Sequence, residues 1–104
     1  MDAVIHFHPP FTTAHAVAKK KIPMITEAAE IVLLDVPLLP RASPGSIELA
    51  TKVTEGFKDS KVKAVLLTMH GLVSIGKTLK DAYYTTALVE NPAKIALLSS
   101  LIKS

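Results

Sequence analysis

The chain has 104 residues, of which 49% are apolar and 20% charged, and its formal net charge is +3. This length allows one globular domain, and the apolar content excludes a disordered chain. Aromatic residues make up 5% and the basic residues form no long stripe, which argues against nucleic-acid binding, whereas mild basicity suits an anionic small molecule. The chain contains no cysteine, so disulfides and thiolate metal sites are excluded and any metal needs imidazole or oxygen ligands.

The sequence also bears on location and partners. No uninterrupted apolar stretch reaches the roughly 18 residues that a membrane span needs. The N-terminus lacks the basic region and apolar core of a signal peptide. We therefore expect a cytoplasmic protein without membrane contact, and a chain this short is expected to gain from an oligomer or another partner.

The first half of the chain mixes strand-forming and helical patterns. Residues 3–7 predict a strand, which the two following prolines end because proline cannot donate to a sheet ladder. Thr12 or Thr13 is expected to cap a helix that runs to about residue 20. A helical turn is predicted at residues 26–29, and extended structure at residues 31–34 and 36–39.

The second half predicts helices around a buried strand pair. Pro44 suits the first position of a helix, and residues 47–57 carry an apolar stripe at helical spacing. Residues 63–69 and 72–75 predict strands. Thr78 is expected to cap a long helix, which Asn91 and Pro92 should interrupt. Because strands alternate with helices, an α/β layered domain follows.

Three histidines form the candidate metal site. Side chains of a strand alternate between its faces, so His6 and His8 point the same way, and the prolines after them place the pair at a sheet edge. His70 ends another apolar strand, and Gly71 beside it allows close backbone approach. Three imidazoles with open positions are typical of a catalytic metal centre, whereas structural zinc usually has four ligands.

Other titratable residues have an alternative, structural interpretation. His15 is expected on a helix face near the pocket wall and outside the metal site. The carboxylates Glu27, Glu30 and Asp35 are candidate bases only in principle, and solvent-exposed positions explain them better.

A competing motif predicts nucleotide binding. Residues 71–78 match the P-loop pattern G-x-x-x-x-G-K-[ST], with an apolar strand before and a helix after. Asp35 is the candidate magnesium ligand in this hypothesis. However, residues 72–75 contain no glycine and favour a strand, whereas a P-loop wraps phosphate with flexible backbone.

The chain resembles the class II aldolase/adducin family over residues 3 to about 102. The similar segments are AVIHFHPPFTTAHAVA (3–18), KKKIPMITEAA (19–29), ASPGSIELA (42–50) and AVLLTMHGLVSIGKTLKDAYYTTALVE (64–90). Their order and spacing are specific, although each segment alone is weak. In this resemblance the P-loop letters are coincidental, because the two glycines fall at the family's His-Gly and post-strand positions.

The resemblance implies a fold, a metal and a chemistry. The expected fold is a three-layer α/β/α sandwich with a mostly antiparallel or mixed sheet. His6, His8 and His70 are expected to bind one divalent ion, usually zinc in this family. The expected reaction is cleavage of a ketose 1-phosphate, such as L-fuculose 1-phosphate, to dihydroxyacetone phosphate and an aldehyde through a metal-stabilised enediolate. A tetramer is expected by analogy only.

The chain also departs from the family pattern. Family chains are roughly twice as long, and their first half carries a phosphate-binding region and an acid/base carboxylate. We therefore expect residues 1–104 to be one partial domain, the metal-binding C-terminal portion, with the catalytic residue unassigned and little activity alone. Met69 stands where asparagine or histidine is common, and Glu27 where fuculose-phosphate aldolases have tyrosine. The alternatives to an aldolase are an epimerase or dehydratase, a non-catalytic module like the adducin head, and the P-loop nucleotide binder.

Overall fold

The chain folds around a four-stranded mixed sheet. The structure is a computed structural model and describes residues 2–104. The strand order is β1-β4-β3-β2, in which β4 is antiparallel to β1 and β3 while β2 runs parallel to β3. In chain order the elements are β1 (Ala3–Phe7), α1 (Pro10–Ala18), the π-helix η1 (Ala29–Leu33), β2 (Leu38–Leu39), α2 (Ile47–Gly56), β3 (Ala64–Leu67), β4 (Gly71–Gly76) and α3 (Leu79–Lys103).

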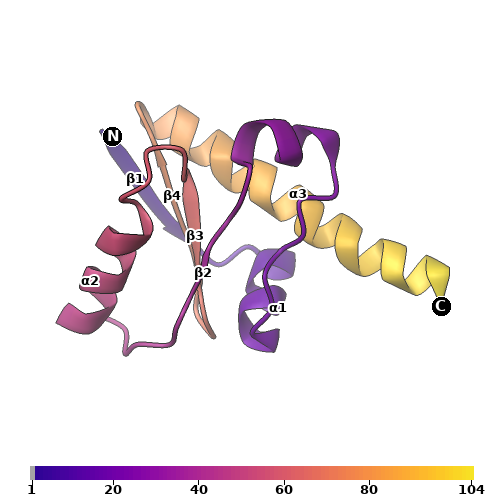
Figure 1. Cartoon of the computed structure of the whole chain (residues 1–104), viewed down its shortest axis with the longest axis horizontal. Coiled ribbons are helices and arrows are strands. Elements are labelled where there is room, and N and C mark those ends of the chain that lie inside the picture. The colour runs from indigo at the N-terminus through magenta and orange to yellow at the C-terminus, as the bar shows by residue number, and fades with distance from the viewer. Residues whose placement is uncertain (1) are drawn as a thin grey trace.

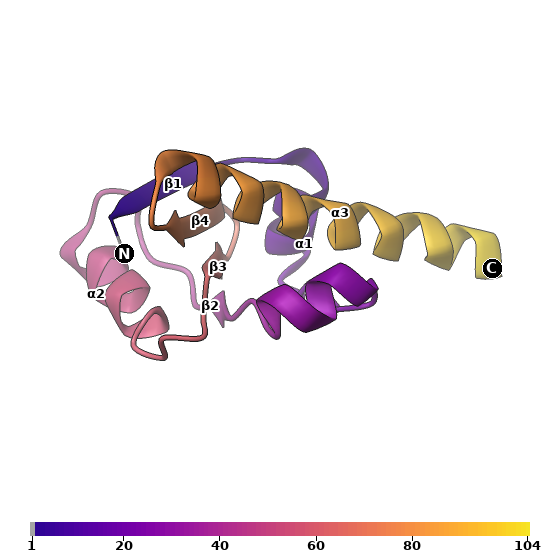
Figure 2. The ribbon, with the colours of Figure 1, turned by 90° about the horizontal axis from the view of Figure 1, so that it is seen from above.

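Helices cover both faces of the sheet. α2 lies on one face, while α1, η1 and α3 lie on the other (Figure 1). Seen from above, the strands separate α2 from α3, and the last turns of α3 extend beyond the sheet (Figure 2). This is the three-layer α/β/α architecture that the resemblance implied. No helix within residues 2–104 combines the length and apolar character needed to cross a membrane.

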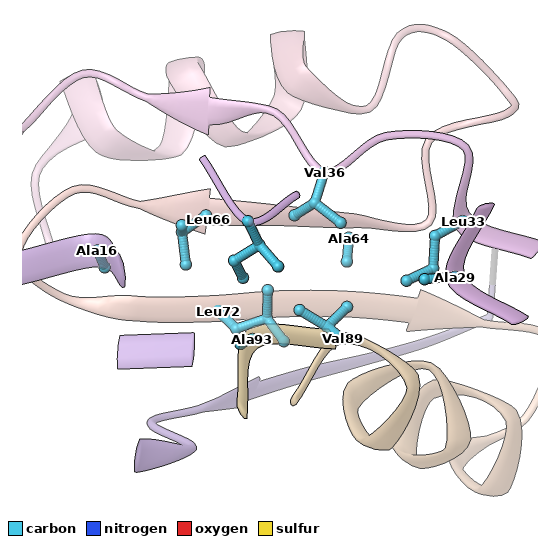
Figure 3. Close-up of a cluster of buried hydrophobic side chains, with 10 residues drawn as sticks. Ala16, Ala29, Leu33, Val36, Ala64, Leu66, Leu72, Val89 and Ala93 are labelled. Atoms are coloured by element: carbon cyan, nitrogen blue, oxygen red, sulfur yellow. The ribbon is translucent and has the colours of Figure 1, made fainter. Parts of the chain in front are cut away.

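Two hydrophobic clusters hold the layers together. The larger one packs Leu66 of β3 and Leu72 of β4 against Val89 of α3, all fully buried (Figure 3). The smaller one packs β-strand residues such as Val65 against Val53 and its neighbours on α2. Because both faces are covered, all four residues of β3 are buried, and each buried leucine or valine contributes about 1.5–3 kcal/mol.

The helix α1 begins earlier than the sequence predicted. Its first residue is Pro10 and its N-cap residue is Pro9, so neither Thr12 nor Thr13 is the cap. Proline suits the first turn of a helix because its missing N–H would have no intrahelical partner there. Pro9 has no side-chain acceptor, which leaves the first amides of α1 to find another partner.

The segment before β2 is helical and not extended. Residues 31–34 were expected to be extended, yet Ile31 to Leu33 belong to η1 and Leu34 ends it with a φ of 61°. The amide of Ala29 donates to the Thr26 hydroxyl at 3.2 Å, which starts the turn. The expected extended stretch 36–39 contains the short strand β2. An apolar run of this length does not distinguish a buried strand from a buried helical turn.

The start of α2 differs from the prediction, whereas the start of α3 agrees with it. α2 begins at Ile47, where the Ser46 hydroxyl accepts from the Leu49 amide at 3.0 Å, so Pro44 lies in the preceding turn. The Thr78 cap of α3 is confirmed, since its hydroxyl accepts from the Asp81 amide at 3.1 Å.

The predicted interruption of α3 is wrong. The helix runs unbroken through Asn91 and Pro92. Pro92 lacks the N–H that would donate to the Leu88 carbonyl, which costs a helix roughly 3 kcal/mol. Its ring is fully buried, and the neighbouring Val89 and Ala93 are buried in the core. Packing of this face therefore outweighs the local preference for a break.

Candidate metal centre

The sheet brings together histidines from two distant parts of the chain. His6 lies on β1, and His8 follows the last residue of that strand. His70 is the last residue of the tight connection between β3 and β4. Because β1 pairs with β4, with Phe7 opposite Leu72, the end of β1 lies beside this connection. The sheet pairing thus places His70 next to the His6 and His8 pair.

Three Nε2 atoms converge at this point. The Nε2 atom of His6 lies 3.1 Å from Nε2 of His70 and 3.2 Å from Nε2 of His8. Ligand atoms of all three residues lie within 4.8 Å of one another. A neutral imidazole has one lone pair, so His6 Nε2 can accept from only one of its two neighbours. A shared cation would use all three lone pairs at once.

The ring of His6 is fixed in the tautomer that a metal ligand needs. Its Nδ1–H donates to the carbonyl oxygen of Leu72 at 3.0 Å. A carbonyl only accepts, so Nδ1 carries the proton and Nε2 keeps its lone pair. A histidine ligand that donates its other ring N–H to a carbonyl is typical of metal sites, where this bond sets ring orientation and basicity.

The environment keeps His70 neutral. Burial lowers the pKa of the His70 imidazole, and a positive charge on His6, and then on His8, lowers it further whenever those rings carry one. Desolvation disfavours the charged form of a histidine, and like charges act in the same direction. His70 is therefore uncharged at neutral pH, as metal coordination requires. Its Nδ1 atom is buried and has no hydrogen-bond partner.

The three residues fit a divalent metal ion of the zinc type. With Zn–N bonds of about 2.0–2.1 Å, a tetrahedral ion spaces its nitrogens about 3.3 Å apart. The two Nε2 separations, 3.1 and 3.2 Å, are close to that spacing. Three imidazoles would leave at least one position of the ion for a substrate oxygen.

A hollow adjoins the histidines on the α2 side of the sheet. Its volume is about 540 Å³, and His6 and His70 form part of its wall. Val4 of β1, Ser46 before α2 and Leu49 of α2 line other parts of it. A small molecule in this hollow would therefore touch His6 and His70.

The other candidate residues lie outside the cluster. His15 is on α1, the helical position that the structural interpretation predicted, and its ring Nδ1 contacts the Phe11 carbonyl oxygen at 2.8 Å. Asp35 forms an exposed ion pair with Lys21 at 2.7 Å. Glu27 and Glu30 are solvent-exposed. Among residues 2–104, the only group of histidines and carboxylates arranged to hold a metal is the three-histidine cluster, so no carboxylate belongs to it.

The structure contradicts the P-loop hypothesis. Residues 71–76 form β4, which is hydrogen-bonded to β1 on one side and β3 on the other. Its amides are engaged in the ladders and cannot wrap a phosphate. The glycines at its two ends belong to the strand and not to a phosphate-binding loop.

One structurally important residue was not predicted from the sequence. The carboxylate of Glu90, on α3, accepts hydrogen bonds from the amides of Phe11 and Thr12 at the start of α1. The Thr12 hydroxyl donates to the same carboxylate. The available signal was a helix that begins at two prolines, neither of which has a side chain able to cap it.

Comparison with known proteins decides the family. The profile of the family described as Class II Aldolase and Adducin N-terminal domain matches residues 1–97. The chain belongs to the class II aldolase and adducin family. The resemblance found in the sequence is thereby confirmed, and class II aldolases are metal-dependent enzymes.

Individual relatives are sugar-phosphate aldolases. The L-fuculose phosphate aldolase of Methanococcus maripaludis strain S2 is 32% identical over 103 residues, which are 99% of this chain and 55% of that protein. The Haemophilus influenzae enzyme of the same name is 36% identical over 90 residues, 86% of this chain and 41% of that protein. The chain thus spans about half the length of the curated relatives it matches.

Solved structures agree with this family assignment. An L-fuculose 1-phosphate aldolase superposes with a TM-score of 0.87 at 27% identity, over 97% of this chain and 47% of that one. A sugar-phosphate aldolase from Thermotoga maritima has a TM-score of 0.84 over 97% of this chain and 46% of that one. At 24% identity, the second comparison supports the fold alone.

Proposed function

We propose that this chain is the metal-binding portion of a divalent-metal-dependent sugar-phosphate aldolase. The ligands of the metal are His6, His8 and His70, and zinc is the ion. The observation that carries the proposal is the convergence of three Nε2 atoms, with His6 Nε2 at 3.1 and 3.2 Å from the other two. The His6 Nδ1–H bond to a carbonyl supports the same role.

The proposed substrate is a ketose 1-phosphate, with L-fuculose 1-phosphate as the first candidate. Its cleavage would give dihydroxyacetone phosphate and an aldehyde. Two observations support this choice: relatives covering most of the chain are named L-fuculose phosphate aldolase, and the hollow beside His6 and His70 is open to a small molecule. The net charge of +3 favours a phosphorylated ligand.

The residues of this chain have defined tasks in that chemistry. His6, His8 and His70 would hold the ion, which would supply Lewis-acid chemistry for the ketone and adjacent hydroxyl oxygens of the substrate. The histidines hold it while remaining neutral, and the Leu72 carbonyl orients the ring of His6. The reaction also needs a base that moves a proton. Because the histidine cluster of residues 2–104 contains no carboxylate, we propose that this base comes from outside the cluster.

Metal analysis of the purified chain tests the proposal. After loading with zinc and desalting, we expect one zinc per chain for the wild type and none for His6→Ala or His70→Ala. His15→Ala is the matched control, since this histidine lies on α1 and should leave the zinc content unchanged. Retention of zinc by both His6→Ala and His70→Ala, or no zinc in the wild type, would contradict the assignment.

A non-catalytic metal-binding module is the second candidate. The observation that favours it is the same lack of a carboxylate in the cluster within residues 2–104. Turnover in a retro-aldol assay with L-fuculose 1-phosphate is the result that would exclude this candidate. We expect the zinc-loaded chain alone to show little or no turnover. Zinc-dependent aldehyde release that disappears in His70→Ala would establish aldolase activity and exclude the non-catalytic module.

We also propose that the chain assembles with further copies, as the family analogy suggests. Support comes from α3, whose last turns extend past the sheet with apolar side chains exposed to solvent. Leu101 is 63% exposed and Ile102 84%. Light scattering of the chain should give a mass above the 11.1 kDa of a monomer, and a change of both residues to Lys should reduce it.

A further inference from the structure

We propose that Glu90 is a positioning residue for His8. In this role it fixes the start of α1 to α3 and thereby sets where the chain carries the His8 imidazole. The inference rests on the proposed metal site, because the position of the His8 ring affects function only if this ring is a metal ligand. It adds a function for a residue that lies on another element and, among residues 2–104, forms its hydrogen bonds with Phe11 and Thr12 and not with any of the three rings.

The carboxylate of Glu90 makes an unusually complete set of contacts. One oxygen accepts from the Thr12 amide at 2.7 Å and from the Thr12 hydroxyl at 2.7 Å. The other accepts from the Phe11 amide at 3.1 Å. These partners are 78 and 79 residues away in the sequence, on a helix that packs beside α3 (Figure 1). A carboxylate is also the charge that a helix N-terminus favours.

The start of α1 depends on this carboxylate because no local cap exists. The first four amides of a helix lack intrahelical partners. Pro10 has no N–H, and the Thr13 amide donates to the Pro9 carbonyl at 2.8 Å. The amides of Phe11 and Thr12 remain, and Pro9 has no side-chain acceptor for them. Glu90 supplies from α3 what a serine or aspartate at the N-cap would normally supply.

His8 is the ligand that most needs such support. His6 lies in a strand and its ring donates to the Leu72 carbonyl. The amide of His70 donates to the Leu67 carbonyl at 2.9 Å, which fixes the connection that carries it. His8 comes after the last pair of β1, and within residues 2–104 its ring has no hydrogen bond except the contact with His6.

The link from Glu90 to His8 is short and stiff. Only two residues, both prolines, separate His8 from Phe11, and a proline ring fixes the φ angle of its residue. Motion of the α1 start is therefore transmitted to His8 with little loss. His8, Pro9 and Glu90 also line one hollow on the α3 side, so this part of the chain faces open space there.

A double-mutant cycle tests the role. Zinc affinity is measured by competition with a chromogenic chelator for the wild type, Glu90→Gln, His8→Ala and the double variant. Glutamine keeps the size of the side chain but presents an NH₂ group to an amide donor and loses the charge. We expect Glu90→Gln to weaken zinc binding about 10–100-fold, as other outer contacts of metal ligands do. In the His8→Ala background the same change should have no further effect, because no His8 ring remains to be placed.

Cobalt substitution supplies a spectroscopic readout. The d–d absorption of bound Co²⁺ reports the number and symmetry of its ligands. Glu90→Gln should shift this spectrum toward that of His8→Ala. Thr78→Ala is the matched control, since it removes the cap of α3 without touching α1 and should keep the wild-type spectrum and zinc affinity. If Glu90→Gln does not fold, Thr12→Val removes one donor to the carboxylate and should weaken zinc binding by a smaller factor.

The outcomes separate this inference from the proposed function. Zinc binding by the wild type with equal affinity in Glu90→Gln overturns the role of Glu90 and leaves the metal site intact. If Glu90→Gln weakens zinc binding equally in the wild-type and His8→Ala backgrounds, the substitution causes a general loss of structure, and the role of Glu90 is again overturned. A wild-type chain that binds no zinc overturns both proposals.

Discussion

The backbone of Gly71 lies against the imidazole of His8. A β-carbon at residue 71 would lie 2.5 Å from Cδ2 of His8 and 2.7 Å from the carbonyl oxygen of Phe7. Both separations are shorter than any real β-carbon contact, so only glycine lets the two segments approach this closely. The interpretation of the His-Gly pair as a point of close approach is therefore confirmed.

Gly71→Ala should disrupt the proposed metal site more than the fold. The added methyl group must displace either the His8 ring or the β1 backbone, and overpacking of this kind costs about 1–3 kcal/mol. We expect zinc affinity to fall at least about tenfold, as for other changes next to metal ligands. Chelator competition and urea unfolding, each with Gly71→Ala and the wild type, measure the two effects.

Gly56→Ala is the control for this substitution. Its β-carbon would lie 3.0 Å from Cγ1 of Val65 and 3.3 Å from Cδ2 of Leu39, which are side-chain ends of the smaller core cluster. It should therefore lower stability without changing zinc affinity. Equal zinc affinities in Gly71→Ala and Gly56→Ala would show that the contact with His8 does not shape the site.

Acidification should weaken both zinc binding and the metal-free fold through His70. The pKa of His70 is lower in the folded chain than its ordinary value of 6.5, which applies to the unfolded chain. At a pH between the folded and the unfolded pKa, the unfolded chain therefore binds more protons than the folded chain. The contribution of His70 to stability is thus fully present above pH 6.5 and is lost as the pH falls through the folded pKa. Zinc affinity should fall in the same range, because protons compete with the ion for neutral imidazole.

Urea unfolding at pH 7.5 and pH 5, with chelator present, measures this effect. His70→Asn should show a smaller loss of stability between the two pH values than the wild type. His15→Asn is the control, since its ring lies on α1 away from the cluster, and its pH dependence should match that of the wild type. If the wild-type chain is more stable at pH 5 than at pH 7.5, the pH dependence of its stability has the opposite sign, and the predicted effect of His70 is wrong.

Leu66 should be among the most important residues for stability. It is fully buried in the larger core cluster, between β2 and β4 in the sheet. Leu66→Ala is expected to lower the free energy of unfolding by about 2–5 kcal/mol, the usual cost of such a cavity. Val17→Ala, at an exposed position of α1, should change it by less than about 0.5 kcal/mol. Circular dichroism during urea unfolding compares them.

The sequence predicted the histidine cluster because simple geometry governs it. His6 and His8 share a face through the two-residue period of a strand, and His70 ends an apolar strand beside a glycine. The family resemblance then implied that these two strand ends meet. The pairing of β1 with β4 supplied the remaining step, which no local pattern contains.

The missed features depend on tertiary contacts. Glu90 caps α1 across 78 residues, and nothing near it in the sequence indicates that partner. Pro92 remains inside α3 because its ring is buried, although local preference predicted a break there. The apolar run at residues 31–34 lacks a clear period, so burial against the core, and not propensity, makes most of it helical.

Met69→Gly should make the chain more stable without loss of metal binding. Met69 has a φ of 63°, inside the connection between β3 and β4, and its side chain is 52% exposed, so little packing depends on it. A left-handed conformation costs a non-glycine residue about 1–2 kcal/mol, of which the greater freedom of glycine in the unfolded chain offsets a part. We expect a gain of about 0.5–1 kcal/mol in urea unfolding and unchanged zinc affinity, because the Leu67 carbonyl still holds the His70 amide. Lys19→Gly, where φ is 58° at the end of α1, should give a similar gain. A loss of stability in Met69→Gly alone would mean that the methionine side chain stabilises this connection through contacts that outweigh its backbone strain.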